Sequence, residues 1–279
     1  MKFLIFILLI SFSFPFFSEE FLILSGNATQ GGILIGNVHQ DVEQVFWNEK
    51  NLAISDQKII IGFDRDEPLE HQISLIFKNG EIIKKDFLIS KREYEIQRID
   101  KIKKEYVEKP VDKNLLRRIS NESKSLQAVR SGIYKENDIM FEEFIRPIEE
   151  GKISGVFGSQ RILNGIPKSP HSGLDIAAPK GTPVKAMSNG IVALIGDYFY
   201  NGKFVLIDHG LGLSSIYIHL DSIAVELGQN VEIGEQIGSV GSTGRATGPH
   251  LHWGVNYFKK RIDPELLLDQ DEKFLIIKK

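Results

Sequence analysis

The chain has 279 residues, 42% hydrophobic residues and a formal net charge of −3. Because acidic and basic residues are mixed along the chain, no broad basic face for nucleic acid is expected. The sequence contains no cysteine, which excludes disulfides, thiol catalysis, cysteine-ligated zinc and a lipidated N-terminal cysteine. Any metal bound here would therefore need histidine and carboxylate ligands.

The first residues have the layout of an export signal. Met1-Lys2 is a short basic start, and an apolar run follows from Phe3 to about Phe17. This run is shorter than the ~20 apolar residues of a transmembrane helix, and it suits a signal peptide. Residues 1–18 are thus predicted to be a signal peptide. An uncleaved N-terminal anchor is the alternative, because no clear small-x-small cleavage site precedes Glu19. Both predict action outside the cytoplasm, in the periplasm or cell envelope.

Residues 21–100 contain short apolar, β-branched runs separated by turn residues. This spacing predicts a small antiparallel β-sandwich. Asn79-Gly80 predicts a hairpin, because both residues tolerate a positive φ. The two histidines of this segment, His39 and His71, are expected on the surface.

Residues 101–140 change character and become charged, with apolar side chains at helical spacing. Asp112 is a candidate N-cap, and Pro110 and Gly132 bracket the run. A helical connector is predicted, with no chemistry of its own. Its apolar positions are Leu115, Leu116, Ile119, Leu126, Val129 and Ile133.

Residues 145–270 are rich in glycine and in short apolar runs, which predicts a mainly antiparallel β domain. Asn189-Gly190 is a second hairpin signal. The predicted fold class is therefore mainly β, with a small N-terminal sandwich, a helical connector and a C-terminal antiparallel sheet.

Five residues of the C-terminal domain suggest metal chemistry: His171, Asp175, His219, His250 and His252. His250 and His252 lie two apart in a predicted strand, so both can reach one site from the same face, ~7 Å apart. His171 and Asp175 would lie ~13 Å apart in an extended strand, too far to share an ion. A bend at Ser172-Gly173 is therefore expected.

A catalytic zinc commonly has three protein ligands and a water, so a cluster of five groups leaves two for acid-base work. Zinc lowers the pKa of bound water towards ~7, and a neighbouring imidazole can accept its proton. This division predicts peptide hydrolysis without a covalent intermediate. His209, at a predicted strand-to-turn junction, is expected to hold a loop rather than the metal.

Five stretches of the C-terminal half are Val156 to Arg161, His171 to Pro179, Gly181 to Val184, Ile216 to Leu220 and Gly241 to His252. In this order, over about the last half of the chain, they resemble the LytM or lysostaphin-type metallopeptidases of family M23. The resemblance implies that His171, Asp175 and His252 bind one zinc ion per chain, and that His219 and His250 assist the water and stabilise the oxyanion.

The family's substrates are peptide bridges of bacterial cell-wall peptidoglycan, either D-amino-acid cross-links or glycine-rich bridges. The resemblance therefore implies a zinc-dependent peptidoglycan endopeptidase. The N-terminal segment, with Lys91 to Asp100 before the connector, also resembles the Ig-like β domain that precedes the peptidase domain in some members. Such a stem could position or cover the catalytic groove.

Two other functions remain open. One is a non-catalytic activator of another cell-wall hydrolase, which the complete set of five groups disfavours. The other is a zinc hydrolase with a different substrate, since substrate choice depends on groove loops. Candidate groove residues are 161–168, 198–202 and 245–247, and Tyr198, Phe199 and Tyr200 either line a peptide site or pack within the β domain. Some regulation is expected, because an unrestrained cell-wall endopeptidase would damage its own cell. A regulatory protein partner is one candidate for it, although the sequence does not identify the agent. The sequence indicates no oligomeric state.

Overall fold

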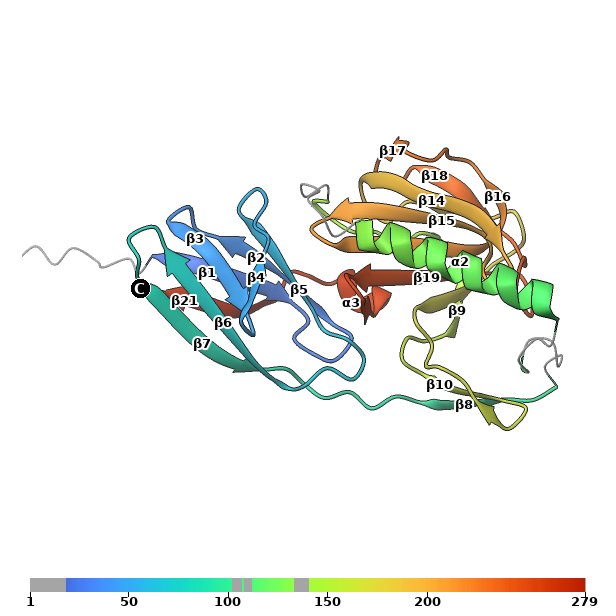
Figure 1. Ribbon diagram of the computed structural model, residues 1–279, viewed down its shortest axis with the longest axis horizontal. Helices are drawn as coiled ribbons and strands as arrows, with labels where there is room; N and C mark the ends of the chain where they lie inside the picture. The colour runs from blue at the N-terminus through green and yellow to red at the C-terminus, as the bar shows by residue number, and fades with distance from the viewer. Residues whose placement is uncertain (1–18, 102–106, 108–111, 133–140, 279) are drawn as a thin grey trace, which may run out of the picture.

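The computed structural model describes residues 19–101, 107, 112–132 and 141–278 (Figure 1). The predicted leader at 1–18 and Ile133 of the connector lie outside these residues. Within them, no helix has both the length and the apolar character needed to cross a membrane. The fold is mainly β, and most strand pairs are antiparallel, so the predicted fold class is confirmed.

The N-terminal part is a sandwich of two four-stranded sheets. The apolar side chains of its strands alternate inward, as β6 shows with every second residue buried. Leu22, Leu24, Ile33 and Ile73 are among the fully buried residues between the sheets. One sheet has the order β21 (Lys273–Lys278), β1 (Glu20–Gly26), β2 (Ile33–Val38) and β5 (Lys58–Gly62). The other has the order β4 (Lys50–Leu52), β3 (Val42–Trp47), β6 (Glu70–Phe77) and β7 (Ile82–Leu88).

The last described strand belongs to this sandwich, although it follows the C-terminal domain in sequence. β21 pairs antiparallel with β1, with Ile276 opposite Ile23 and Leu275 opposite Leu24. Figure 1 shows this strand lying at the edge of the sandwich. The chain thus leaves the sandwich after β7 and returns to it at residue 273.

The two hairpin predictions have different outcomes. β6 and β7 form the predicted hairpin around Asn79-Gly80. Of these two residues, Gly80 has a positive φ of 84°, whereas Asn79 does not have a positive φ. The prediction of a hairpin at Asn189-Gly190 is wrong. Gly190 starts β14 (Gly190–Tyr198), whereas the preceding β13 (Pro183–Lys185) pairs with the distant β18 (Gln236–Val240). A non-local pairing replaced the local one.

A ten-stranded sheet forms the C-terminal part, with β18 and β20 (Lys260–Ile262) paired to its main path and β13 paired to β18. Its centre is apolar on the inner face, where Tyr217, Leu251 and Trp253 are fully buried. Leu220 and Val240 lie opposite each other where β16 meets β18. The main path runs β17 (Asn230–Val231), β14, β15 (Gly202–Gly210), β16 (Leu213–Ile223), β19 (His250–Tyr257), β12 (Leu174–Ala177) and β9 (Lys152–Gly155).

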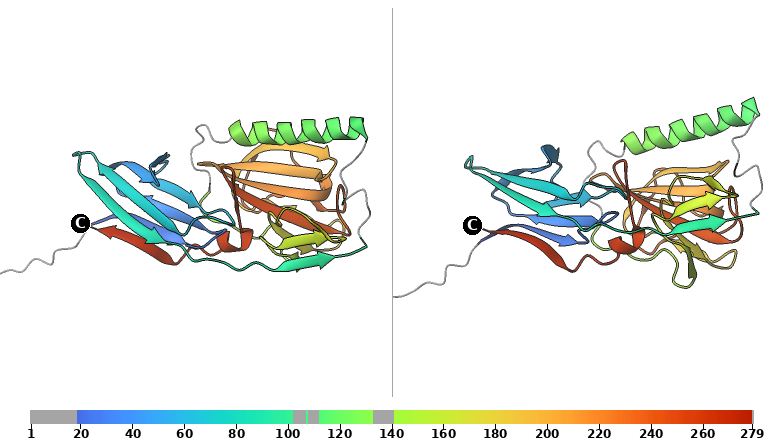
Figure 2. Two further views of the ribbon diagram at one scale, coloured as in Figure 1. Left: turned by 60° about the horizontal axis from the view of Figure 1, so that its bottom comes forward. Right: turned by 90° about the horizontal axis from the view of Figure 1, so that it is seen from below.

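The predicted connector forms helix α2 (Lys113–Gly132), which lies along the outside of β14 and β15 (Figures 1 and 2). Asp112 caps it, since its Oδ1 accepts from Leu115 N at 2.7 Å. Leu126 and Val129 pack on the small apolar cluster of Phe204, Leu206 and Ile216. Helix α2 therefore covers the outer face of the large sheet.

The segment that follows Ser90 runs along the C-terminal part as a strap, residues 91–99 (Figure 2). Its strand β8 (Ile96–Ile99) pairs parallel with β10 (Gln160–Leu163), which also pairs with β11 (Ile166–Pro167). Arg92 forms an ion pair of 2.9 Å with Asp263, the N-cap of α3 (Pro264–Leu267). The strap therefore belongs to the surroundings of the C-terminal sheet, although the sequence placed it with the sandwich.

Candidate active site

Two neighbouring strands place Asp175 and His252 side by side. β12 and β19 are antiparallel, and Asp175 lies directly opposite His252 in their register. Residues directly opposite in an antiparallel pair project to the same face. The absence of a side chain at Gly173 permits this close approach to β19, because a Cβ there would lie 2.3 Å from Trp253 O and 2.9 Å from His252 Nε2. The chain bends at Gly173 as predicted, and this bend brings His171 back over β12.

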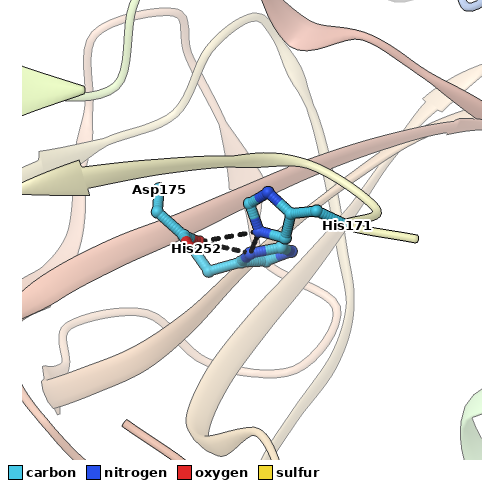
Figure 3. Close-up of side chains that lie close together, drawn as sticks. All are labelled: His171, Asp175 and His252. Carbon is cyan, nitrogen blue, oxygen red and sulfur yellow. Dashed lines mark hydrogen bonds and ion pairs between the residues drawn. The ribbon is translucent and has the colours of Figure 1, made fainter. Parts of the chain in front are cut away.

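The three residues point their ligand atoms at one another (Figure 3). His252 Nδ1 lies 2.7 Å and His171 Nε2 lies 3.0 Å from Asp175 Oδ1, and the two nitrogens are 2.9 Å apart. All three side chains are buried. Among the described residues they form a group whose ligand atoms could hold one metal ion. We refer to His171, Asp175 and His252 as the triad.

The chemistry of the triad fits a divalent cation. His171 Nδ1 lies 2.9 Å from the carbonyl of Val156 and can only donate to it, so a neutral His171 has its lone pair on Nε2. That lone pair faces a carboxylate oxygen, which is favourable only with a proton or a cation between them. A carbonyl that fixes the histidine tautomer in this way is a common feature around metal ligands.

The carboxylate of Asp175 is held in its charged form. Burial would raise the pKa of Asp175, but the close polar contacts with His171 and His252 outweigh burial and lower the pKa. Arg161 Nη2 donates to the other oxygen, Oδ2, at 2.5 Å. Oδ2 is thus occupied by the guanidinium, and Oδ1 is left facing the two imidazoles.

His219 and His250 form a pair beside the triad, with ring centroids 4.8 Å apart. Each Nδ1 lies 2.8 Å from a backbone carbonyl, of Thr243 for His219 and of Gly248 for His250. Each neutral ring therefore has its lone pair on Nε2. His250 Nε2 lies 4.0 Å from Asp175 Oδ1, which places the pair next to the triad.

His219 is aimed by an irregularity in β16. Its φ is 66°, and the pairing of β15 with β16 shifts register between Val205 and Lys203. Such bulges redirect side chains next to functional sites. Burial, and then the neighbouring His250 and His252, lower the pKa of His219 to about 3. The ring is therefore neutral at pH 7.

The triad and the pair line one groove of about 680 Å³. We call this cavity the groove. The three segments predicted from sequence all contribute to it, through residues that include Arg161, Tyr200 and Arg245. Of the three aromatic residues, Tyr200 lines the groove. Tyr198 instead packs on Phe204 and donates to Ser125 Oγ of α2 at 3.1 Å.

Sequence reasoning missed the strap residues of the groove. Gln97 and Ile99 of β8 line it, as does Arg261 from β20. β8 reaches the groove through a parallel pairing with residues more than sixty positions away. No local pattern in 96–99 encodes that pairing, so only the tertiary structure could reveal it.

The remaining histidines lie outside the groove. His209 is fully buried, with Nδ1 2.6 Å from Asn189 O and Nε2 2.8 Å from Ser215 Oγ, consistent with the expected structural role. His39 is partly exposed. The prediction that His71 lies on the surface is wrong, because Trp47, Phe63 and Phe87 enclose its ring.

Peptidase family M23 matches residues 169–264, a range that includes the triad and the pair. The chain is 39% identical over 144 residues to the peptidoglycan DD-endopeptidase ShyA of Vibrio cholerae, covering 49% of this chain and 33% of the relative. It is 39% identical over 120 residues to the DD-carboxypeptidase/endopeptidase Mpg of Neisseria meningitidis, covering 43% and 28%. The matches thus span about a third of these curated relatives.

A solved structure is similar over most of the chain. A crystal structure from Pseudomonas aeruginosa, described as a peptidase M23, covers 87% of this chain and 96% of its own, with 28% identity and a TM-score of 0.59. This similarity extends over the sandwich as well as the large sheet, because a share of 87% exceeds the C-terminal part alone. Residues 169–264 of this chain therefore form a domain of peptidase family M23.

Proposed function

We propose that this protein is a zinc-dependent endopeptidase that hydrolyses peptide cross-links of bacterial cell-wall peptidoglycan. The observation that carries the proposal is the convergence of His171 Nε2, Asp175 Oδ1 and His252 Nδ1 within 3.0 Å of one another, beside a second pair of histidines. The M23 domain and the DD-endopeptidase relatives support the substrate class. We further propose that the protein is exported and acts in the cell envelope.

In this proposal the triad holds one zinc ion, with Arg161 fixing the free oxygen of Asp175. Bound zinc would supply Lewis acidity and lower the pKa of water towards ~7. His219 is neutral at pH 7 and accepts the proton of the attacking water. His250 stabilises negative charge that develops on the attacked carbonyl oxygen. The surrounding groove binds the substrate peptide.

The proposal is tested by zinc content and by mass spectrometry of peptidoglycan digested with wild-type protein, His171→Ala and His219→Ala. The wild type is expected to bind one zinc ion and cut cross-linked muropeptides. His171→Ala should lose the metal. His219→Ala should keep the metal and lose activity by roughly 10²–10⁴-fold, the usual contribution of an acid-base group.

His39→Ala serves as the matched control, because His39 lies in the sandwich and outside the groove. It should behave as wild type in both assays. A wild-type protein that binds zinc but cuts no muropeptide would contradict the enzyme proposal. The protein would then be interpreted as a non-catalytic activator, and a partner hydrolase would be sought.

A further inference from the structure

The groove is positively charged although the chain has a formal net charge of −3. Among the described residues that line it, one is acidic, Asp175. That carboxylate already faces two imidazoles and is paired with Arg161. A site of this sign attracts anionic ligands and raises their local concentration. The basic residues of the lining are Arg161, Lys168, Arg245 and Arg261.

These four cations are not equivalent. Arg161 is paired with Asp175, and the Lys168 amine donates to the carbonyl of Val107. For the Arg245 guanidinium, as for that of Arg261, no acceptor is present among the described residues within hydrogen-bonding distance. A guanidinium has five N–H donors, so this side chain has donors left for a ligand.

Arg245 is exposed, but unlike Arg261 it has two contacts that restrain its position. Its guanidinium carbon lies 4.9 Å from the centroid of the Tyr200 ring, and its backbone N donates to Tyr200 O at 2.9 Å. The loop before it packs tightly, because a Cβ on Gly244 would lie 2.2 Å from Gly202 N. A guanidinium stacked on an aromatic ring loses less conformational freedom when it binds a ligand. Arg245 is therefore arranged as a binding group.

We infer that Arg245 is a specificity residue that binds a free carboxylate of the substrate peptide next to the cleaved bond. This inference rests on the proposed function. The planar guanidinium matches a carboxylate through two parallel hydrogen bonds. The substrate class is thus an acidic cross-link peptide with an ionised carboxylate near the cleaved bond. A glycine-rich bridge has no side-chain carboxylate to offer this group.

The test compares cross-linked muropeptide dimers with free carboxylates and the same dimers after amidation. Full-length wild-type protein, Arg245→Ala and Arg245→Lys are assayed for kcat and KM, with zinc content measured in each. On the acidic dimer, Arg245→Ala should lower kcat/KM by about 10–100-fold, mainly through KM, as expected for hydrogen bonds between charged groups. Arg245→Lys should recover part of the loss. On the amidated dimer the three proteins should be equal.

Arg117→Ala is the matched control, because Arg117 is an exposed arginine of α2 that does not line the groove. An equal loss on both dimers, or no loss on the acidic dimer, would overturn the inference. Binding of the two dimers is measured in parallel by calorimetry, which separates the two proposals. If the wild type binds zinc and cuts neither dimer, the proposed activity fails. Weaker binding of the acidic dimer alone to Arg245→Ala would then still support the carboxylate site, and unchanged binding would refute it.

Discussion

The sandwich and the large sheet both bury histidines, but they use the ring nitrogens differently. In the sandwich, Trp47 Nε1 donates to His71 Nδ1 at 3.1 Å, and Asn48 Nδ2 lies 3.0 Å from the same nitrogen. In the large sheet, His219 and His250 contact backbone carbonyls through Nδ1, and Nε2 is left on the side of the groove. Burial alone therefore does not identify a functional histidine. His71 also has a nitrogen without a hydrogen-bond partner among the described residues, Nε2, but that atom is buried in the sandwich. The informative feature is a ring nitrogen left without a partner on a histidine that lines the groove.

His209 sharpens this comparison, because it lies in the large sheet but has both nitrogens occupied. Burial lowers its pKa to about 4, against 6.5 for an exposed histidine. Below pH 6.5, His209 therefore binds a proton in the unfolded chain, whereas in the folded protein it stays neutral down to about pH 4. Wild-type stability should fall across this window by up to about 3 kcal/mol from this group. Above pH 6.5 the group should have no effect.

The measurement is the free energy of unfolding by urea at several pH values for wild type and His209→Gln. The variant should have a flatter profile between pH 6.5 and 4 and unchanged zinc content. Comparing the two proteins cancels the titration of the remaining groups. Parallel profiles would show that His209 is not held neutral by its surroundings.

A substitution of Arg161 tests how the groove keeps the Asp175 carboxylate facing the triad histidines. Removing its contact with Asp175 Oδ2 frees that oxygen, and the carboxylate can then turn away from the imidazoles. Loss of such a supporting group typically costs 10–100-fold in metal affinity. Arg161→Ala should therefore weaken zinc binding by about that factor in a competition titration with a chelator. The same substitution at Arg117 should leave the affinity unchanged, and an unaltered affinity in Arg161→Ala would contradict the supporting role.

The sequence predicted features that depend on neighbouring residues. The bend at Gly173, the N-cap at Asp112 and the hairpin at Gly80 each follow from local chemistry, and the structure contains all three. The five candidate site residues were also identified from spacing and family resemblance, and the structure brings them to one groove. Their individual roles stay predictions.

The features that escaped prediction depend on residues far apart in the chain. β21 returns to β1 across some 250 residues, and β8 pairs with β10 to supply Gln97 and Ile99 to the groove. His71 was expected on the surface, whereas Trp47, Phe63 and Phe87 cover it in the fold. Tertiary packing of this kind overrides local pattern.

Helix α2 offers the smallest of these tests, because it contacts the edge of the groove without contacting any imidazole. Glu122 Oε2 accepts from Phe199 N at 3.0 Å, and Phe199 directly precedes the groove residue Tyr200. Glu122→Ala should loosen the turn between β14 and β15, which contains Phe199. It should raise KM by about 2–10-fold, the range for one hydrogen bond, with kcat and zinc content unchanged. Glu122→Gln keeps an acceptor and should show a smaller change.

Lys124→Ala, at an exposed position of the same helix, controls for a general effect on α2. If Glu122→Ala and Lys124→Ala raise KM equally, the contact with Phe199 does not shape the groove. If Glu122→Ala lowers kcat and leaves KM unchanged, the helix acts on the histidines rather than on peptide binding. A change in KM alone would show that the shape of the groove affects peptide binding independently of the histidines, because the contact between Glu122 and Phe199 involves no imidazole of the site.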